Sequence, residues 1–206
     1  YTQRVPTDGS SHRQSPLALY VAGEMISKSF SVPATDLEEI LARNCHISDT
    51  ARAARFCRQA EQARYFCKDI HYPDVPLHTP TFDTTLLSAH IRPGHVMLID
   101  CWASWCGPCR AAIPAVKALY DKYDRDRFDV ISISLDSKKE DWQKALEEEK
   151  MPWPQFIAGN RGYEQLTLRY NINSIPNLIL IDDKGQVVCN TFSPEEISIE
   201  LEEILR

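Results

Sequence analysis

The sequence has 206 residues, of which 43% are hydrophobic and 25% are charged. This length fits one domain with an extension or two small domains, and the composition allows a buried core without a disulfide framework. The net charge of −6 argues against a nucleic-acid partner, because binding to phosphates requires a concentrated basic face. No apolar run approaches the roughly 20 residues that span a bilayer.

The N-terminal part is expected to be a polar arm followed by helices. The chain opens at Tyr1 without a methionine or an apolar signal segment, which indicates a processed or trimmed chain, so that any targeting peptide or lipid anchor would lie outside the sequence shown. A capping box at Thr35-Asp36-Leu37-Glu38 predicts a short helix to about Arg43. Ser48 is expected to cap a longer helix that runs to about Ile70.

Prolines separate this extension from the rest of the chain. Pro73 and Pro76 end the second helix, because proline cannot continue a helix and restricts the residue before it. We therefore place a boundary between Pro73 and Pro80, with an arm and helical extension over residues 1–79 and a second domain over residues 80–206.

The hydrophobic pattern of the second domain alternates between strands and helices. The expected strands cover residues 95–100, 128–135, 177–182 and 186–190, and the expected helices cover residues 106–124, 137–150, 162–170 and those after Ser193-Pro194. Capping boxes begin the second and fourth helices at Ser137 and Ser193, and the turn Asp183-Lys184-Gly185 joins the last two strands as a hairpin. This order of elements predicts an α/β sandwich.

A pair of cysteines, in the run Cys106-Gly107-Pro108-Cys109, lies between the first of these strands and the helix that follows it. A cysteine at a helix N-terminus faces the positive end of the helix dipole and unpaired backbone N–H groups, which favour the thiolate. Two intervening residues make one helical turn, so the sulfurs can form and break a disulfide with little backbone movement. The motif predicts a redox site in which Cys106 attacks a substrate disulfide and Cys109 resolves the mixed disulfide.

Two other interpretations of this pair are a zinc half-site and two core cysteines. A structural zinc site would require a second close pair of cysteines or histidines downstream, and only Cys189 follows. We therefore expect neither a metal nor a cofactor at this site.

The residues around the pair carry a family resemblance. The stretch from Met97 to Arg110, Met-Leu-Ile-Asp-Cys-Trp-Ala-Ser-Trp-Cys-Gly-Pro-Cys-Arg, resembles thioredoxin, and especially the TlpA/ResA-like branch of extracytoplasmic bacterial thiol–disulfide oxidoreductases. The match extends over about residues 81–206, through Ile113-Pro114, Ser132–Asp136, Pro152-Trp153-Pro154 and Tyr170–Pro176. The resemblance implies a thioredoxin-like fold, a central mixed sheet flanked by helices, here with an N-terminal helical extension.

The resemblance also implies roles for single residues. Asp100 occupies the position of a buried acid in thioredoxin. A raised pKa would let this carboxyl shuttle the proton of the resolving Cys109. The alternative is a solvated aspartate at the end of a strand. Pro176 matches the cis-proline that presents the backbone of Ile175 to an extended substrate. Trp105 either shields the site or simply packs. The implied substrate-binding residues are Trp105, Gly107, Pro108, Ile175 and Pro176.

Three positions affect this comparison. Many proteins of the branch have a glutamate three residues after the second cysteine, where this chain has Ala112, so the acidic role is expected to rest on Asp100 alone. The residue after the cis-proline is Asn177 instead of the commoner threonine, which bears on which partners dock. Pro114 lies inside the active-site helix and is expected to bend it.

The expected function is therefore the reduction of protein disulfides. The implied partners are disulfide-bonded or thiol-bearing proteins and an upstream electron donor. By analogy with thioredoxin, whose reduction potential is about −270 mV, the site is expected to be a reductant. The resemblance also implies an extracytoplasmic, periplasmic location, with a possible membrane tether outside the sequence shown.

Two other functions compete with this one. A peroxiredoxin-like peroxidase shares the fold, but that family places its cysteine in a Thr-x-x-Cys setting, whereas Ala103-Ser104-Trp105 precedes Cys106 here. The other is a non-enzymatic binding module in which the helical extension recruits a partner.

Five further cysteines complete the total of seven. Cys57 and Cys67 are ten residues apart on one expected helix, about 15 Å along its axis, and so cannot bridge each other. Free core cysteines, a disulfide formed by Cys45, and a metal cluster of Cys45, Cys57, Cys67 and His71 are the alternatives. Cys101 and Cys189 are expected in the core.

Overall fold

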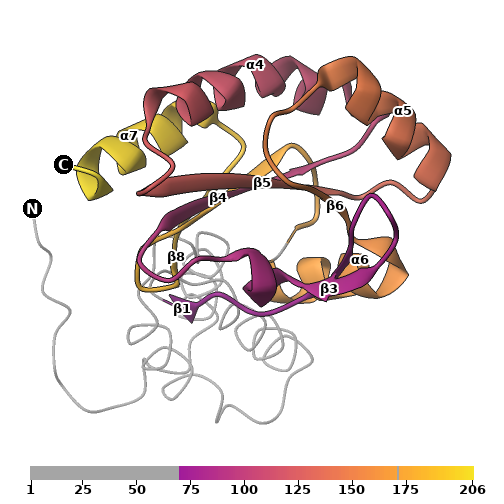
Figure 1. Cartoon of the computed structure of the whole chain (residues 1–206), viewed down its shortest axis with the longest axis horizontal. Coiled ribbons are helices and arrows are strands. Elements are labelled where there is room, and N and C mark those ends of the chain that lie inside the picture. The colour runs from indigo at the N-terminus through magenta and orange to yellow at the C-terminus, as the bar shows by residue number, and fades with distance from the viewer. Residues whose placement is uncertain (1–69, 171) are drawn as a thin grey trace, which may run out of the picture.

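The structure of the chain is a computed structural model, and it describes residues 70–170 and 172–206 (Figure 1). The helices expected over residues 35–43 and 48–69, with Cys45, Cys57 and Cys67, lie outside these residues. Ile70, the last residue of the second expected helix, belongs to a strand.

One mixed sheet of eight strands forms the centre of the described fold, in the order β1-β8-β7-β4-β5-β6-β2-β3. In chain order these strands are β1 (Ile70–His71), β2 (Pro76–His78), β3 (Thr84–Leu86), β4 (Val96–Trp102), β5 (Phe128–Ser134), β6 (Gln155–Ile157), β7 (Asn177–Ile181) and β8 (Gln186–Thr191). The described helices are α4 (Gly107–Lys122), α5 (Lys139–Glu149), α6 (Gly159–Tyr170), α7 (Pro194–Ile204) and a 3₁₀ helix, η3 (Leu87–His90).

Strand β4 lies in the middle of the sheet and leads to the cysteine pair. It pairs in parallel with β5 and antiparallel with β7, and all of its residues are buried. A strand covered on both faces reads as a continuous apolar run, which explains the sequence Val-Met-Leu-Ile at its start.

Helices cover both faces of the sheet. Figure 1 shows α4, α5 and α7 on one face and α6 on the other. Each face has its own core: Leu98 and Trp102 of β4 pack with Ile113 of α4, whereas Ile99 and Cys101 pack with residues of α6. Because side chains alternate along a strand, Asp100 lies on the face of Leu98 and Trp102, beneath α4.

The hairpin and the last helix agree with the sequence prediction. Strands β7 and β8 pair antiparallel around a turn in which Gly185 has a φ of 78°, a conformation that favours glycine. Ser193 caps α7 by accepting a hydrogen bond of 3.3 Å from the Glu196 amide, and Pro194 follows it.

The prediction of a capping box at Ser137 is wrong. Helix α5 begins at Lys139, its N-cap is Lys138, and no side chain forms a capping hydrogen bond there. Glu140 and Asp141 instead place negative charge in the first turn, where the helix dipole favours it.

The sheet also extends further towards the N-terminus than the expected boundary at residue 80. Strand β1 pairs with β8, and β2 pairs with both β3 and β6. Strands β2, β3 and β6 have three residues each and were not predicted. Helix α6 begins at Gly159, three residues before the expected start at Gly162.

Candidate active site

The cysteine pair lies at the connection between β4 and α4. Cys106 and Cys109 form a disulfide, with their Cα atoms 5.2 Å apart. The chain leaves the sheet after Trp102, and α4 begins at Gly107 with Pro108 in its first turn, where a proline is tolerated. Gly107 and Pro108, between the two cysteines, are both exposed.

Cys106 is the N-cap residue of α4. Its sulfur accepts a hydrogen bond of 3.2 Å from the Cys109 amide, one of the amides that have no partner within the helix. The same amide and the positive end of the helix dipole favour a negative charge on this sulfur once the disulfide is reduced.

Cys109 lies on the buried side of α4, in line with Ile113 and Val116. Its exposed fraction is 3% and that of Cys106 is 5%, whereas Trp105 beside them is 69% exposed. Trp105 is therefore an exposed side chain and not a core packing residue, whereas Cys109 lies on the inner side of α4. Pro114 lies within α4, as the sequence places it.

Asp100 is buried beneath α4. One of its oxygens, Oδ2, accepts a hydrogen bond of 2.8 Å from Ser132 Oγ of the neighbouring strand, and Trp153 Nε1 donates to that same hydroxyl at 2.8 Å. Burial raises the pKa of Asp100 to about 6, against the lowering effect of the Ser132 hydrogen bond. The alternative of a solvated strand-end aspartate is excluded by its exposed fraction of 5%.

A second buried carboxylate, Asp136, holds the loop that carries Trp105. It accepts hydrogen bonds from the Ser104 amide at 2.9 Å, from Ser104 Oγ at 2.7 Å and from Ser134 Oγ at 2.6 Å. Asp136 is a residue of the site that no sequence motif identifies. The available signal was a carboxylate two residues beyond a buried strand, close to the end of β4 in the parallel pair.

The segment before β7 lies next to the end of β4, the strand that leads to the cysteine pair. The Ile175–Pro176 peptide bond is cis. Cys101 pairs with Asn177 and Asp100 with Leu178, so this segment runs beside the end of β4. Ile175 is partly buried, and Asn177 is buried.

The other described cysteines lie away from the pair. Cys101 is fully buried on the opposite face of the sheet from Asp100, in the core as predicted, and burial raises the pKa of its thiol well above its ordinary value. Cys189 of β8 is partly buried and packs against the core beneath α4 and α7. Within residues 70–170 and 172–206, no group of three or more His, Cys, Asp and Glu side chains could hold a metal ion.

The fold and the site together define a thioredoxin-like protein with a redox-active Cys-x-x-Cys pair. A family model described as Thioredoxin-like matches residues 94–187. The thioredoxin domain of a thiol-disulfide oxidoreductase from Bacteroides vulgatus has the same fold, with a TM-score of 0.62 over 68% of this chain and 99% of that chain, at 24% identity.

Three further proteins are more similar to this chain in sequence. A structure from Chlorobium tepidum described as the thiol:disulfide interchange protein DsbE is 30% identical to this chain, with a TM-score of 0.57. The match covers 67% of this chain and 95% of that one. Thiol-disulfide oxidoreductase ResA of Geobacillus kaustophilus is 26% identical over 61% of this chain and 75% of its own length. Nucleoredoxin of Xenopus laevis is 33% identical over 60% of this chain and 29% of its own length.

This chain is a thioredoxin-like thiol–disulfide oxidoreductase, related to the bacterial ResA-like proteins. In the part of the chain that the structure describes, no helix is both long and apolar enough to cross a membrane.

Proposed function

We propose that the protein reduces disulfide bonds in other proteins, with Cys106 as the nucleophile and Cys109 as the resolving cysteine. The hydrogen bond from the Cys109 amide to the Cys106 sulfur carries this assignment, because it marks Cys106 as the sulfur stabilised in the anionic form. The burial of Cys109 on the inner side of α4 agrees with a cysteine that acts second.

The reaction moves two electrons from the protein to its substrate. The Cys106 thiolate attacks one sulfur of the substrate disulfide, a mixed disulfide forms, and the other substrate sulfur leaves as a thiolate that takes up a proton. The Cys109 thiol then loses its proton and attacks the Cys106 sulfur. The second substrate thiol is released and the Cys106–Cys109 disulfide remains, the state that the structure shows.

Asp100 is proposed as the group that takes the proton of Cys109. It lies beneath α4 on the face of the sheet to which Cys109 belongs. With a pKa of about 6 it is mostly ionised at neutral pH, so it can accept a proton, and its pKa is near enough to that pH for the proton to leave again.

The substrate is proposed to lie against Trp105, Gly107, Pro108, Ile175 and Pro176. Trp105 and Ile175 approach the cysteine pair from two different segments, and both face one hollow beside it. Gly107 and Pro108, between the two cysteines, are exposed, so an approaching backbone can contact them directly.

The proposed compartment is extracytoplasmic, the periplasm for a bacterial protein, with a reducing donor upstream and a membrane tether outside the sequence shown. The resemblance to the TlpA/ResA-like branch supports this placement. Fractionation of the source cells, with thiol labelling from the outside, tests it.

Trapping of the mixed disulfide tests the roles of the two cysteines. We expect Cys109→Ser, incubated with a disulfide-bonded protein, to accumulate a covalent complex that dithiothreitol releases. Cys106→Ser should form no such complex under the same conditions. A complex formed equally by both variants would contradict the assignment.

A further inference from the structure

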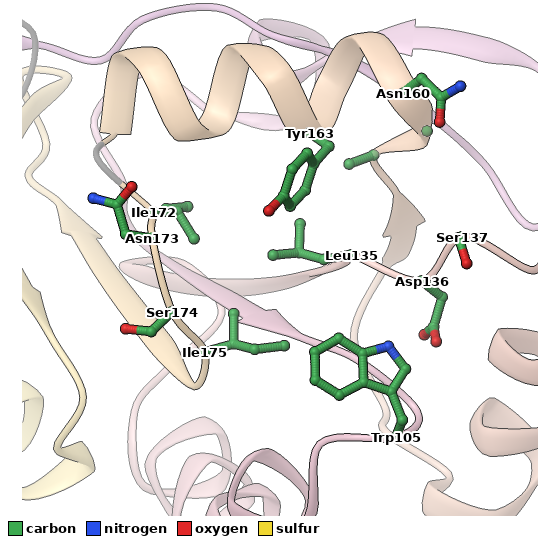
Figure 2. Close-up of a pocket in the computed structure, with 12 residues that line it drawn as sticks. Trp105, Leu135, Asp136, Ser137, Asn160, Tyr163, Ile172, Asn173, Ser174 and Ile175 are labelled. Carbon is green, nitrogen blue, oxygen red and sulfur yellow. The ribbon is translucent and has the colours of Figure 1, made fainter.

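A pocket of about 550 Å³ lies between helix α6 and the loop that carries Trp105, the residue before Cys106. Figure 2 shows the side chains of Leu135, Tyr163 and Ile172 directed into one space, with Ile175 and Trp105 at its lower edge. A volume of this size is typical of pockets that enclose a small molecule or a large side chain.

The wall of the pocket is mainly apolar. Ile172 is buried, and Tyr163 on α6 and Trp105 are 50% and 69% exposed, so both aromatic rings remain accessible. Exposed aromatic rings that face a common space offer edge-to-face and stacked contacts to a third ring. The polar ends of Asn160 and Asn173 lie at its margins (Figure 2).

The side chains that line the pocket supply no positive charge to an acidic occupant. None of the described residues that line it is a lysine, arginine or histidine. Its one carboxylate, Asp136, already accepts hydrogen bonds from Ser104 and Ser134. An apolar group therefore enters without leaving a buried charge unpaired, whereas a carboxylate would be desolvated without a lysine, arginine or histidine among the lining side chains.

The position of the pocket identifies its occupant as part of the substrate. Trp105 precedes Cys106 and Ile175 precedes the cis-proline, so the pocket continues directly into the surface against which a substrate disulfide must lie. An extended chain advances about 3.3 Å per residue, so three residues on either side of the attacked cysteine cover about 10 Å of the surface next to the pair.

We propose that this pocket is a specificity site that binds an aromatic side chain of the substrate polypeptide, within three residues of the cysteine that Cys106 attacks. The inference rests on the proposed function and adds a substrate class to it: disulfide-bonded proteins with an aromatic residue flanking the reactive cysteine. Tyr163 of α6 and Leu135, at the end of β5, are the positioning residues for that ring.

Single-turnover kinetics of the pre-reduced full chain test the proposal without an electron donor. The substrates are disulfide-bonded peptides of one length, in which a single Phe, Ala or Asp occupies each of the three positions on either side of the cysteine. At one position or more, we expect the second-order rate constant for Phe to exceed that for Ala by about tenfold or more, the selectivity that an apolar pocket provides. The constant for Asp should lie below that for Ala.

A matched pair of α6 variants links the selectivity to the pocket. Tyr163→Ala removes a wall of the pocket, and Leu168→Ala removes an apolar side chain of similar exposure, 46%, that does not line it. We expect Tyr163→Ala to reduce the Phe-to-Ala ratio at least threefold and Leu168→Ala to keep it. Reduction of 2-hydroxyethyl disulfide, which has no side chain to bind, is measured in each variant to normalise the rates.

Two results would overturn the inference. Equal rates for Phe and Ala at every position would leave the pocket without a role in selection, and equal ratios in Tyr163→Ala and Leu168→Ala would place the selectivity elsewhere. The proposed function fails separately, since a chain that reduces neither the peptides nor 2-hydroxyethyl disulfide is not a reductase at all.

Discussion

The hydroxyl of Ser132 donates a hydrogen bond of 2.8 Å to Asp100 Oδ2 and accepts one of 2.8 Å from Trp153 Nε1. The Ser132 hydroxyl oxygen thus connects the buried acid of β4 to the Trp153 indole, which lies in the loop between α5 and β6. The hydrogen bond favours the ionised acid, while burial favours the protonated one, and burial dominates.

Replacement of Asp100 by Asn should stabilise the fold at neutral pH. The pKa of Asp100 rises from 3.8 in its ordinary state to about 6 in the folded protein, so the folded state binds the proton more tightly than the unfolded chain. The stability that this proton contributes is complete below about pH 4 and is lost as the pH rises through about 6. At about 1.4 kcal/mol per pH unit, we expect Asp100→Asn to gain on the order of 3 kcal/mol at pH 7 and only about 0.5 kcal/mol at pH 4.

Urea denaturation of wild type and Asp100→Asn at both pH values measures this difference. The same variant should slow the second step of reduction, seen as longer-lived mixed disulfide. A gain in stability that does not depend on pH would show that Asp100 titrates normally.

Replacement of Ser132 by Ala should move the pH profile of the resolution step upward. The variant removes the one hydrogen bond that lowers the pKa of Asp100, so the acid remains protonated to a higher pH. The measurement is the rate of mixed-disulfide resolution against pH. A profile that does not move, with Trp153 fluorescence changed to show that its partner is lost, would separate Asp100 from this step.

Asp136 should matter for stability as well as for substrate binding. Asp136→Ala leaves the Ser104 amide and two hydroxyl groups without their shared acceptor. Loss of a buried charged acceptor costs about 2 to 4 kcal/mol, and the released Trp105 loop should raise KM more than it lowers kcat. Asp129→Ala, which removes the half-exposed pair with Arg92, is the control and should cost less than about 1 kcal/mol.

Arg110, directly after the resolving cysteine, is balanced by two carboxylates of α5. Its Nη2 lies 2.8 Å from Glu148 Oε2 and its Nε 2.5 Å from Glu149 Oε1. Replacement of both glutamates by Gln leaves the arginine charge uncompensated near the active-site helix, so the pKa of the Cys106 thiol should fall, by less than about one pH unit.

The ultraviolet absorbance of the thiolate against pH measures the shift in the reduced double variant. Glu202→Gln breaks the Lys122–Glu202 pair at the far end of α4 and should leave the titration of Cys106 unchanged. A pKa that rises in the double variant would contradict the electrostatic account.

Local patterns predicted the parts of the fold that contain most of the core. Strand β4 and the hairpin of β7 and β8 follow from their apolar runs and turn residues, and Ser193 follows from its capping box. Strands β2, β3 and β6 have only three residues each, too few for a periodic pattern, and they exist because neighbouring strands pair with them.

In the site, too, local patterns predicted some residues, whereas contacts between distant segments could not be predicted. The spacing of the cysteines and their place between a strand and a helix identified Cys106 and Cys109, and the apolar run before Asp100 indicated its burial. The hydrogen bonds that hold the Trp105 loop to Asp136 could not be predicted from the sequence. Ser104 and Asp136 are 32 residues apart and meet only because β4 and β5 pair in parallel. The pocket likewise requires α6 to lie against the segment before β7.

The reduction potential of the Cys106–Cys109 pair tests the central claim most directly. The full chain is equilibrated in graded dithiothreitol buffers, its thiols are trapped, and Cys106→Ser serves as the control without a transition. We expect a reversible two-electron transition near the thioredoxin value of about −270 mV. A potential near that of the strong oxidant DsbA, about −120 mV, or no transition at all, would contradict the assignment as a reductase.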